Sequence, residues 1–535
     1  MLKDGLINTM ESKKLMIYKL CFYIVWSLFL FIILQKGYTI IAYDTPKELR
    51  EMNMPAFVHH LAYGKNLYAR SALKSAIPAP TSMYGFFVPL ILAPFVRLFS
   101  FTTLNTLQIC ELVTLLIEIA GALIFYRLLR RKTNRLLLSA IGMLLFYSCY
   151  WRYSAFGGAF PDQWGLTLSI LLADILYRDK QKNRLRPALY ILILIILFYI
   201  KQYFALTAVG LFVYLFIYSK KDTVKFLLYG IVFGILSVLL VHLIFPLYFS
   251  EVLPIAQGQV LTGDPGYSLR QIALLNKLYG GLGVLGFLHI LIEIYMMIKK
   301  KTVKIEISYT FCQLIFLLLP VILISENQGT NYTYYLQLWY PYVILYCASS
   351  VPAITAYIKS IPHKNIRMLC LTLQYALVLL PLFKTLPMFR CTLMTQEEEA
   401  AWKRAYDILE QYSEGGLLVS MLLSNYCLEN NIATSNYGQA EYNTQENLQN
   451  YKNNKLWRNI FLFDHTEEIL QKNISYHIQI QENIAEQKYS CIAITYTWEY
   501  WLSEEYLSDA GYHILTTESL PAGDQRWNVT FYVTD

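Results

Sequence analysis

Long apolar segments recur along most of this chain and constrain its fold more than any other feature. Runs of roughly 15 to 25 apolar residues repeat from the first fifty residues to about residue 390, and about 20 such residues are enough to cross a bilayer as a helix. Of the 535 residues, 56% are hydrophobic and only 15% are charged. This composition predicts a polytopic α-helical membrane protein.

Basic clusters between the apolar runs indicate how the chain crosses the membrane. Short loops rich in Lys and Arg stay in the cytoplasm, and five such clusters lie near residues 127–135, 178–186, 220–225, 299–304 and 359–367. The connections between them carry few positive charges, so we expect them outside. The alternation predicts about 11 spans, with the N-terminus cytoplasmic and the C-terminus outside, near residues 15–42, 105–126, 135–150, 163–177, 188–200, 203–218, 225–247, 271–298, 305–325, 335–357 and 367–387.

Two segments need separate treatment. The proline-interrupted run at 83–99 cannot be a full span without placing the basic loops outside, so we predict a re-entrant or interfacial helix there. The hairpin made by 188–200 and 203–218 has its apex at Lys201 and Gln202. Both residues are therefore expected near the outer face.

The composition changes at about residue 390. From residue 388 onward there are 21 acidic and 9 basic residues, whereas the preceding part is strongly basic. We therefore expect a membrane domain over 1–390, with a first outer loop at 43–83, and a soluble extracytoplasmic α/β domain over 391–535. Its elements are predicted as a capped polar helix from Thr395 to about Tyr412, a later short helix, and strands near 416–424, 491–495 and 527–534. No phosphate loop, zinc spacing or nucleophile elbow occurs in it, which favours substrate capture or an architectural role.

A carboxylate follows the first apolar run directly, in the motif YDTPKE that begins at Tyr43. Thr45 and Glu48 have capping-box spacing and Pro46 occupies the first helical position, so we predict a helix with Thr45 as its N-cap. Asp44 is then not needed as a cap. A carboxylate without a structural duty, at the lip of a membrane domain, is a catalytic candidate.

Three further charged groups are expected at the same outer rim. They are Asp162, Lys201 and Arg270. Each also has a structural interpretation: an N-cap for Asp162, a snorkelling side chain for Lys201 and a flanking anchor for Arg270.

Metal binding is not expected. His59 and His60 are adjacent, so on a helix they point about 100° apart and cannot chelate one ion together, and we interpret them as surface residues. The nine cysteines show no metal-ligand spacing and are interpreted as structural.

The order of these motifs resembles the GT-C superfamily of polyprenyl-phosphate-sugar-dependent glycosyltransferases, in particular the bacterial RgtA/B/C/D-like branch related to protein O-mannosyltransferases. The similarity covers most of residues 15–390. It rests on the segments YDTPKE, AYGKNLYARSALKSAIPAPTSMYGFFVPLILAPF, FPDQWGLTLSILLADIL, FYIKQYFAL and NQGTNYTYYLQ, taken in this order relative to the spans. Two positions depart from the family pattern, since Thr45 and Gln337 stand where relatives often have Glu.

The resemblance implies a GT-C-like fold and an inverting transfer of a sugar from a membrane-embedded polyprenyl phosphate to an acceptor hydroxyl. Asp44 would act as general base, and Asp162 would orient the acceptor or hold Lys201. Other residues would stabilise the departing phosphate or bind the sugar: Lys201, Gln202, Arg270, Asn331 and Tyr332. We expect Asp44 and Lys201 to meet in one pocket. The implied partners are the lipid-linked donor, membrane lipid, and a glycan, glycolipid or protein acceptor. We assign no metal ligand, cofactor or nucleic acid, and the sequence leaves the use of a divalent metal open.

Two other functional classes remain open at this point. A transporter or flippase for lipid-linked glycans would carry ionisable residues near the bilayer midplane and paired half-helices. A non-catalytic envelope-assembly protein would use its outer domain to bind polymer. Replacing Asp44 by Asn separates the enzyme from the scaffold.

Overall fold

The computed structural model describes residues 2–47, 51, 53–75, 85–153, 158–252, 266–300, 308–328, 335–389, 393–435, 448–449, 452–453, 465–495, 502–522 and 525–534. Glu48, Asn331 and Tyr332, which the sequence singled out, lie outside this part of the chain.

Helices occupy most of the described residues before residue 389. They are α1 (Leu2–Ala42), α4 (Thr106–Thr133), α5 (Leu136–Tyr153), α6 (Pro161–Gln181), α7 (Pro187–Ile200), α8 (Thr207–Tyr218), α9 (Lys220–Ile244), α11 (Tyr267–Lys300), α12 (Tyr309–Cys312), α13 (Leu318–Gln328), α14 (Tyr340–Lys359) and α15 (Lys364–Thr385), with one π-helical turn joining α12 to α13. A helix lies at each position where the sequence predicts a span. Among the described residues, five helices are long and apolar enough to cross a membrane, in α1, α4, α9, α14 and α15.

The outer faces of these helices are apolar. Only 6% of the most apolar stretch of α9 is buried, and its exposed side chains include Leu236, Leu240 and Leu243. A helix that is apolar on its exposed side is unstable in water but suits hydrocarbon. The chain is therefore a membrane protein, and the number of crossings and their direction stay predictions.

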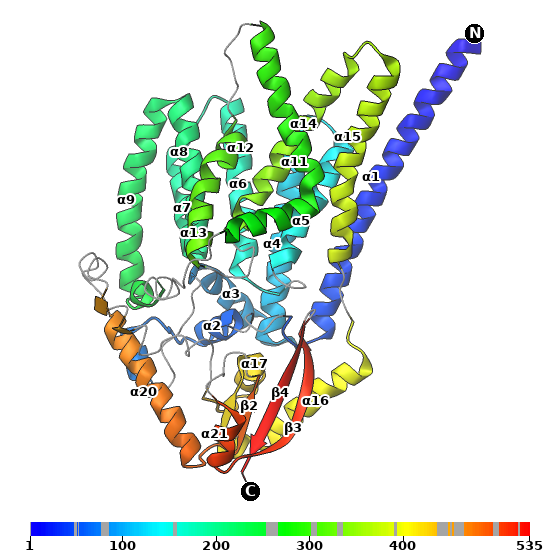
Figure 1. The fold of residues 1–535 in the computed structure, drawn as a ribbon. Coiled ribbons are helices and arrows are strands. Elements are labelled where there is room, and N and C mark those ends of the chain that lie inside the picture. The colour runs from blue at the N-terminus through cyan, green and yellow to red at the C-terminus, as the bar shows by residue number, and fades with distance from the viewer. Residues whose placement is uncertain are drawn as a thin grey trace.

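Two short helices form a layer beside the membrane helices. Helix α3 (Phe87–Leu98) matches the predicted interfacial segment, and α2 (Asn53–Ala62) packs on it through Met54 and Val58, which share a buried cluster with Val88 and Leu92. Figure 1 shows this layer between the membrane helices and the C-terminal part of the chain.

The predicted helix start at Thr45 is wrong. Pro46 and Lys47 are not helical, and the next α-helix among the described residues is α2, which begins at Asn53. The carboxylate of Glu51 accepts a hydrogen bond from the Lys47 backbone N–H at 2.8 Å. Asp44 is therefore followed by a non-helical segment over 45–47.

The C-terminal region, defined as the described residues from 393 to 534, combines helices with a four-stranded sheet of order β1-β2-β4-β3. Strands β1 (Leu417–Val419) and β2 (Cys491–Ile494) are parallel, and β4 (Gln525–Val533) pairs antiparallel with β2 and with β3 (His513–Ala522). The helices are α16 (Gln396–Gln411), α17 (Met421–Glu429), α20 (Thr466–Ala485) and α21 (Glu504–Asp509).

In this region the sequence predicted one helix correctly and one strand incorrectly. The capping box of Thr395 and Glu398 is present, and α16 ends at Tyr412 as its C-cap. The segment predicted as one strand over 416–424 is instead the short β1 followed by helix α17. Its continuous apolar run fits either a buried strand or a buried helix, so periodicity cannot separate them.

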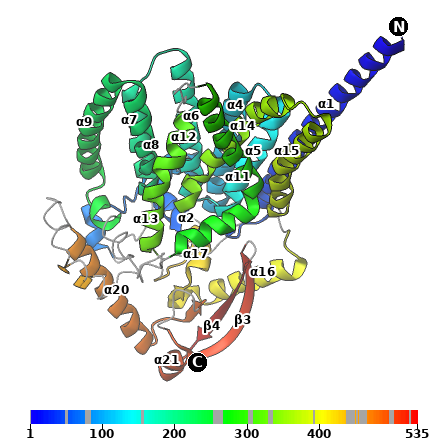
Figure 2. The ribbon, with the colours of Figure 1, turned by 45° about the horizontal axis from the view of Figure 1, so that its top comes forward.

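The C-terminal region is tied to the membrane helices. The backbone of His465 donates to the Ser250 hydroxyl at 2.8 Å, and the Thr466 hydroxyl donates to the Ser250 carbonyl at 2.8 Å. Figures 1 and 2 both show α20 and the sheet at the end of the molecule opposite the N-terminus.

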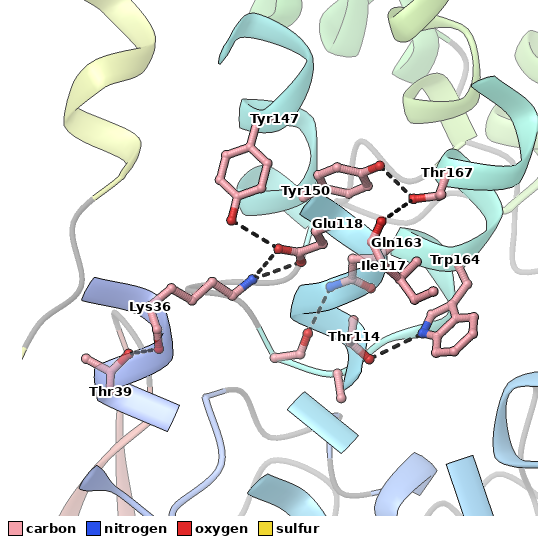
Figure 3. Close-up of polar contacts among 12 residues, drawn as sticks. Lys36, Thr39, Thr114, Ile117, Glu118, Tyr147, Tyr150, Gln163, Trp164 and Thr167 are labelled. Atoms are coloured by element: carbon pink, nitrogen blue, oxygen red, sulfur yellow. Dashed lines mark hydrogen bonds and ion pairs between the residues drawn. The ribbon is translucent and has the colours of Figure 1, made fainter. Parts of the chain in front are cut away.

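A buried ion pair joins α1 to α4. Lys36 Nζ donates to both carboxylate oxygens of Glu118 at 2.8 and 2.7 Å, and the Tyr147 hydroxyl donates to the same carboxylate at 3.3 Å (Figure 3). The two charged side chains are 1% and 0% exposed. Gly121, one turn further along α4, admits the Tyr150 hydroxyl, because a Cβ there would lie 2.0 Å from it.

We predict that Lys36→Met destabilises the protein by about 3–5 kcal/mol, because it leaves Glu118 buried without a cation. Adding Glu118→Leu should restore most of this loss, since replacing both charges of a buried pair is often neutral. The readout is the midpoint of thermal unfolding of the full chain in detergent. The matched control is Lys225→Met, which removes an exposed partner 3.9 Å from Asp222 and should change little. Equal losses in the single and double variants would contradict this account.

Candidate active site

Asp44 lies in a cavity between the membrane helices and the C-terminal region. The cavity has a volume of about 380 Å³ and is lined from the membrane side by Asp44, Tyr63, Asn105 and Thr106, and from the C-terminal region by Tyr406, Asn425, Tyr426, Glu429 and Asn430. The Asp44 side chain reaches solvent. The surrounding protein nevertheless raises its pKa through desolvation, against a smaller lowering effect of its own backbone and of Lys47. Asp44 is thus a stronger base than an ordinary aspartate.

The turn that carries Asp44 is held from several sides. The Asn105 side chain donates to the Asp44 carbonyl at 3.3 Å, and the backbone N–H of Met394 donates to the Tyr43 hydroxyl at 3.0 Å. Lys47 Nζ donates to the Thr45 carbonyl at 3.0 Å. The Asp44 turn therefore contacts both α4 and the start of the C-terminal region.

Asp162 and Lys201 form a second cluster. Lys201 Nζ donates to both oxygens of Asp162 at 3.1 Å, and the Tyr203 hydroxyl makes a short hydrogen bond to the same carboxylate. Phe160 is the N-cap of α6 and Pro161 opens the helix, so Asp162 lies in the first turn, where an anion is stabilised, but is not the cap. Lys201 follows the last residue of α7, and its side chain is only 13% exposed, so it does not simply snorkel to the interface.

The two clusters are joined through Glu51. Its carboxylate accepts the backbone N–H of Lys47, three residues after Asp44, and makes a short hydrogen bond with the backbone N–H of Ala159, three residues before Asp162. Burial raises the pKa of Glu51, and the two N–H donors partly oppose this effect. Gly158 makes the approach possible, because a Cβ there would lie 2.6 Å from the carboxyl group.

The remaining predicted site residues do not gather around Asp44. Gln202 begins the 3-10 turn Gln202–Leu206 beside Lys201, and its side-chain nitrogen is buried without a hydrogen bond among the described residues. Arg270 lies in the first turn of α11 and is exposed. Neither Lys201 nor Arg270 belongs to the described lining of the Asp44 cavity. Asp44 and Lys201 therefore occupy two linked clusters rather than one described pocket, and Asn331 and Tyr332 lie outside the described residues.

The two histidines are not surface residues. His60 is buried, which lowers its pKa to about 4 and keeps it neutral. His59 contacts the Thr106 hydroxyl at 3.1 Å and Glu429 at 3.4 Å. Within the part of the chain that the structure describes, no three metal-ligating side chains gather.

Sequence reasoning missed several residues of this region. Glu51 stood in the first outer loop without a motif, and the cavity residues of α16 and α17 are far from Asp44 in the chain. Glu111 and Glu118 lie within one apolar run, and their spacing of seven residues places them on one face of α4. In the structure both are fully buried, and Glu111 lies near Glu51 and Lys47. Two carboxylates spaced two helical turns apart within an apolar run could have indicated a buried polar site in α4.

Comparison of the sequence with known families and proteins found no relative. No protein-family model matches the chain, and no curated protein matches it.

Solved structures do match. ArnT from Cupriavidus metallidurans bound to undecaprenyl phosphate has a TM-score of 0.53 at 11% identity, and the similarity covers 95% of this chain and 97% of ArnT. The apo form of the same protein gives a TM-score of 0.53 at 10% identity, with the same coverage. The oligosaccharyltransferase AglB from Archaeoglobus fulgidus, in complex with an inhibitory peptide and a dolichol-phosphate, gives a TM-score of 0.46 at 12% identity, over 96% of this chain and 74% of AglB.

The likeness to ArnT extends over nearly the whole of both chains, at an identity that carries information on the fold alone. The resemblance seen in the sequence motifs is thereby confirmed for the architecture: this chain has the GT-C fold.

Proposed function

We propose that this protein is an inverting glycosyltransferase that moves a sugar from a polyprenyl-phosphate donor to an acceptor hydroxyl at the outer face of the cytoplasmic membrane. The observation that carries the proposal is that the Glu51 carboxylate bonds the backbone on both sides of the site. One bond is three residues from Asp44, and the other is three residues from Asp162, the partner of the largely buried Lys201. The ArnT fold supports it, since ArnT has been solved with undecaprenyl phosphate bound.

Asp44 is the proposed general base. It lies in an open cavity that an acceptor can enter, and its raised pKa makes it a better proton acceptor than a surface aspartate. As the acceptor oxygen attacks the anomeric carbon, its proton passes to the Asp44 carboxylate. The bond between the anomeric carbon and the phosphate oxygen breaks, and the electron pair leaves with the lipid phosphate.

Lys201 is the proposed stabiliser of that phosphate. Its ammonium group donates to Asp162, whose carboxylate is also bonded by the Tyr203 hydroxyl, and it lies 5.2 Å from the centre of the Tyr203 ring. Because the ammonium is held in place, little reorganisation is needed when negative charge develops nearby. The resting ion pair is neutral overall, and an incoming phosphate therefore competes with Asp162 for the ammonium. The proposed contributions of Gln202, Arg270, Asn331 and Tyr332 to sugar or phosphate binding extend this role.

The Glu51 carboxylate is the proposed positioning group. It fixes the Asp44 turn relative to the first turn of α6, so the spacing of base and cation depends on it. Misplacement of a catalytic group by about 1 Å can reduce the rate about 10²-fold.

A transporter for lipid-linked glycans is the second candidate, favoured by one observation: the Lys36–Glu118 pair is buried among the membrane helices. A transporter that moves charge through this pair loses activity in the Lys36→Met, Glu118→Leu double variant. A glycosyltransferase retains sugar transfer in that variant.

We predict that Asp44→Asn abolishes sugar transfer, with a loss of about 10²- to 10⁴-fold, because the amide cannot accept the proton. The measurement is a mass-spectrometric comparison of envelope glycans and glycolipids from cells that carry the wild-type chain, the variant or no copy. Asp509→Asn is the control, since Asp509 is an exposed carboxylate of α21. In the wild-type protein, activity should fall as the pH is lowered and Asp44 takes up a proton. The midpoint of this fall should lie above 3.8, the ordinary pKa of Asp, because the pKa of Asp44 is raised. Full activity of Asp44→Asn would remove this mechanism.

We also predict that Lys201→Met impairs both folding and transfer, because Asp162 is left buried without its cation. Combining it with Asp162→Asn should restore the thermal midpoint in detergent without restoring transfer. Restored transfer in the double variant would show that Lys201 serves only to neutralise Asp162.

For Glu51 we predict a graded effect. Glu51→Gln keeps one acceptor for the two backbone N–H groups and Glu51→Ala keeps none, so the rate should fall from wild type to Gln to Ala, by about 10²-fold at the alanine. The acid limb of the pH–rate profile should stay where Asp44 places it, and the loss should be in kcat more than in KM. A shifted or missing acid limb would instead assign proton transfer to Glu51.

A further inference from the structure

We infer that the cavity beside Asp44 binds an uncharged saccharide, so that the acceptor is a glycan rather than a phosphorylated lipid or a peptide. The inference takes from the proposed function only the role of Asp44 as the base in that cavity. Its support comes from the lining residues of the C-terminal region.

The cavity has the size and composition of a ligand site. Its volume of about 380 Å³ falls within the range of roughly 300–1,000 Å³ that is usual for small-molecule pockets. Amide, hydroxyl and carboxylate groups converge on it from both sides: Asp44, Asn105 and Thr106 from the membrane part, and Asn425, Glu429 and Asn430 from the C-terminal region.

Asn425 provides the most specific observation. The residue is 4% exposed and lines the cavity, yet its side-chain oxygen has no hydrogen-bond partner among the residues that the structure describes. A buried acceptor without a partner costs free energy. A hydroxyl group of a bound ligand would satisfy it.

Two tyrosines form an aromatic wall. The rings of Tyr406 and Tyr426 are stacked, with centroids 3.8 Å apart and an interplanar angle of 4°. The Tyr426 hydroxyl donates to Glu410 at 2.5 Å, which holds that ring in place. Rigid aromatic side chains pack against apolar surface while their hydroxyl ends remain polar. A pyranose ring, with apolar C–H faces and a polar rim, has the matching chemistry.

The charge of the lining selects against anionic acceptors. Its charged members among the described residues are Asp44 and Glu429, and both are acidic. Glu429 is already engaged, because it accepts the Thr106 backbone N–H at 2.9 Å and contacts His59 at 3.4 Å. A phosphate or carboxylate in the cavity would meet negative charge without a lining cation, whereas a neutral hydroxyl-rich ligand would not.

The inference can be tested by saturation-transfer difference NMR on the detergent-solubilised full chain. The probes are maltotriose, mannotriose and cellotriose as neutral saccharides, trigalacturonate as an anionic saccharide, and a serine-containing tripeptide. At least one neutral trisaccharide should bind, and the anionic saccharide and the peptide should bind at least tenfold more weakly. Preferential binding of either of those two, or no binding of any neutral trisaccharide, overturns the inference.

Asn425→Leu separates a ligand role from a structural one. The variant removes the unpaired acceptor at similar volume, so the thermal midpoint should stay or rise while trisaccharide binding weakens about tenfold or more. Asn430→Ala changes an exposed residue of the lining, so a folding defect is not expected. This variant should weaken trisaccharide binding several-fold. The matched control is Asn483→Leu on α20, which should bind as the wild type does. Unchanged binding in both Asn425→Leu and Asn430→Ala overturns the inference.

The two proposals fail in different ways. If Asp44→Asn retains transfer while neutral trisaccharides bind to the cavity, the proposed general base is wrong and the saccharide site stands. If sugar transfer depends on Asp44 but proceeds to a peptide or a phosphorylated lipid and no trisaccharide binds, the saccharide site is wrong and the transferase stands.

Discussion

The bidentate contact of Glu51 with the backbone of Lys47 and Ala159 is the interaction on which the arrangement of this site depends. Each of these amides lies three residues from a proposed functional carboxylate, Asp44 on one side and Asp162 on the other. A buried backbone N–H without an acceptor costs free energy. Moving the two segments apart would therefore leave one of these N–H groups without its acceptor, which disfavours their separation. Gly158 makes this contact possible, because any side chain there would displace the Glu51 carboxyl group.

Features encoded in short stretches of sequence were predictable. The membrane helices follow from apolar length, and α16 follows from the capping box of Thr395 and Glu398. The same local rule failed at Thr45, since Pro46 and Lys47 are not helical and the Lys47 backbone N–H is bonded to the Glu51 carboxylate instead. The strand β3 and the helix α20 were not predicted, and β3 forms by pairing with β4 along nearly its whole length.

The site was predictable only in part, for the same physical reason. Asp44, Asp162 and Lys201 could be placed at one rim from topology, since charged residues at the ends of apolar runs are conspicuous. The contacts of Asn425 and Glu429 with the cavity could not, because they require residues more than 300 positions apart to meet. Glu429 also accepts the first backbone N–H of α4, so the C-terminal region completes a membrane helix as well as the cavity.

The Lys36–Glu118 pair has a consequence for how the chain enters the bilayer. Helix α1 leaves the ribosome about eighty residues before Glu118, so its lysine faces the translocon or lipid before any carboxylate can neutralise it. A lysine at the centre of a membrane helix costs about 2.5–3.5 kcal/mol on translocon-based scales, and the cost is lower for Lys36, which lies near the end of α1. The carboxylate of Glu118 can offset this cost only once α4 lies beside α1.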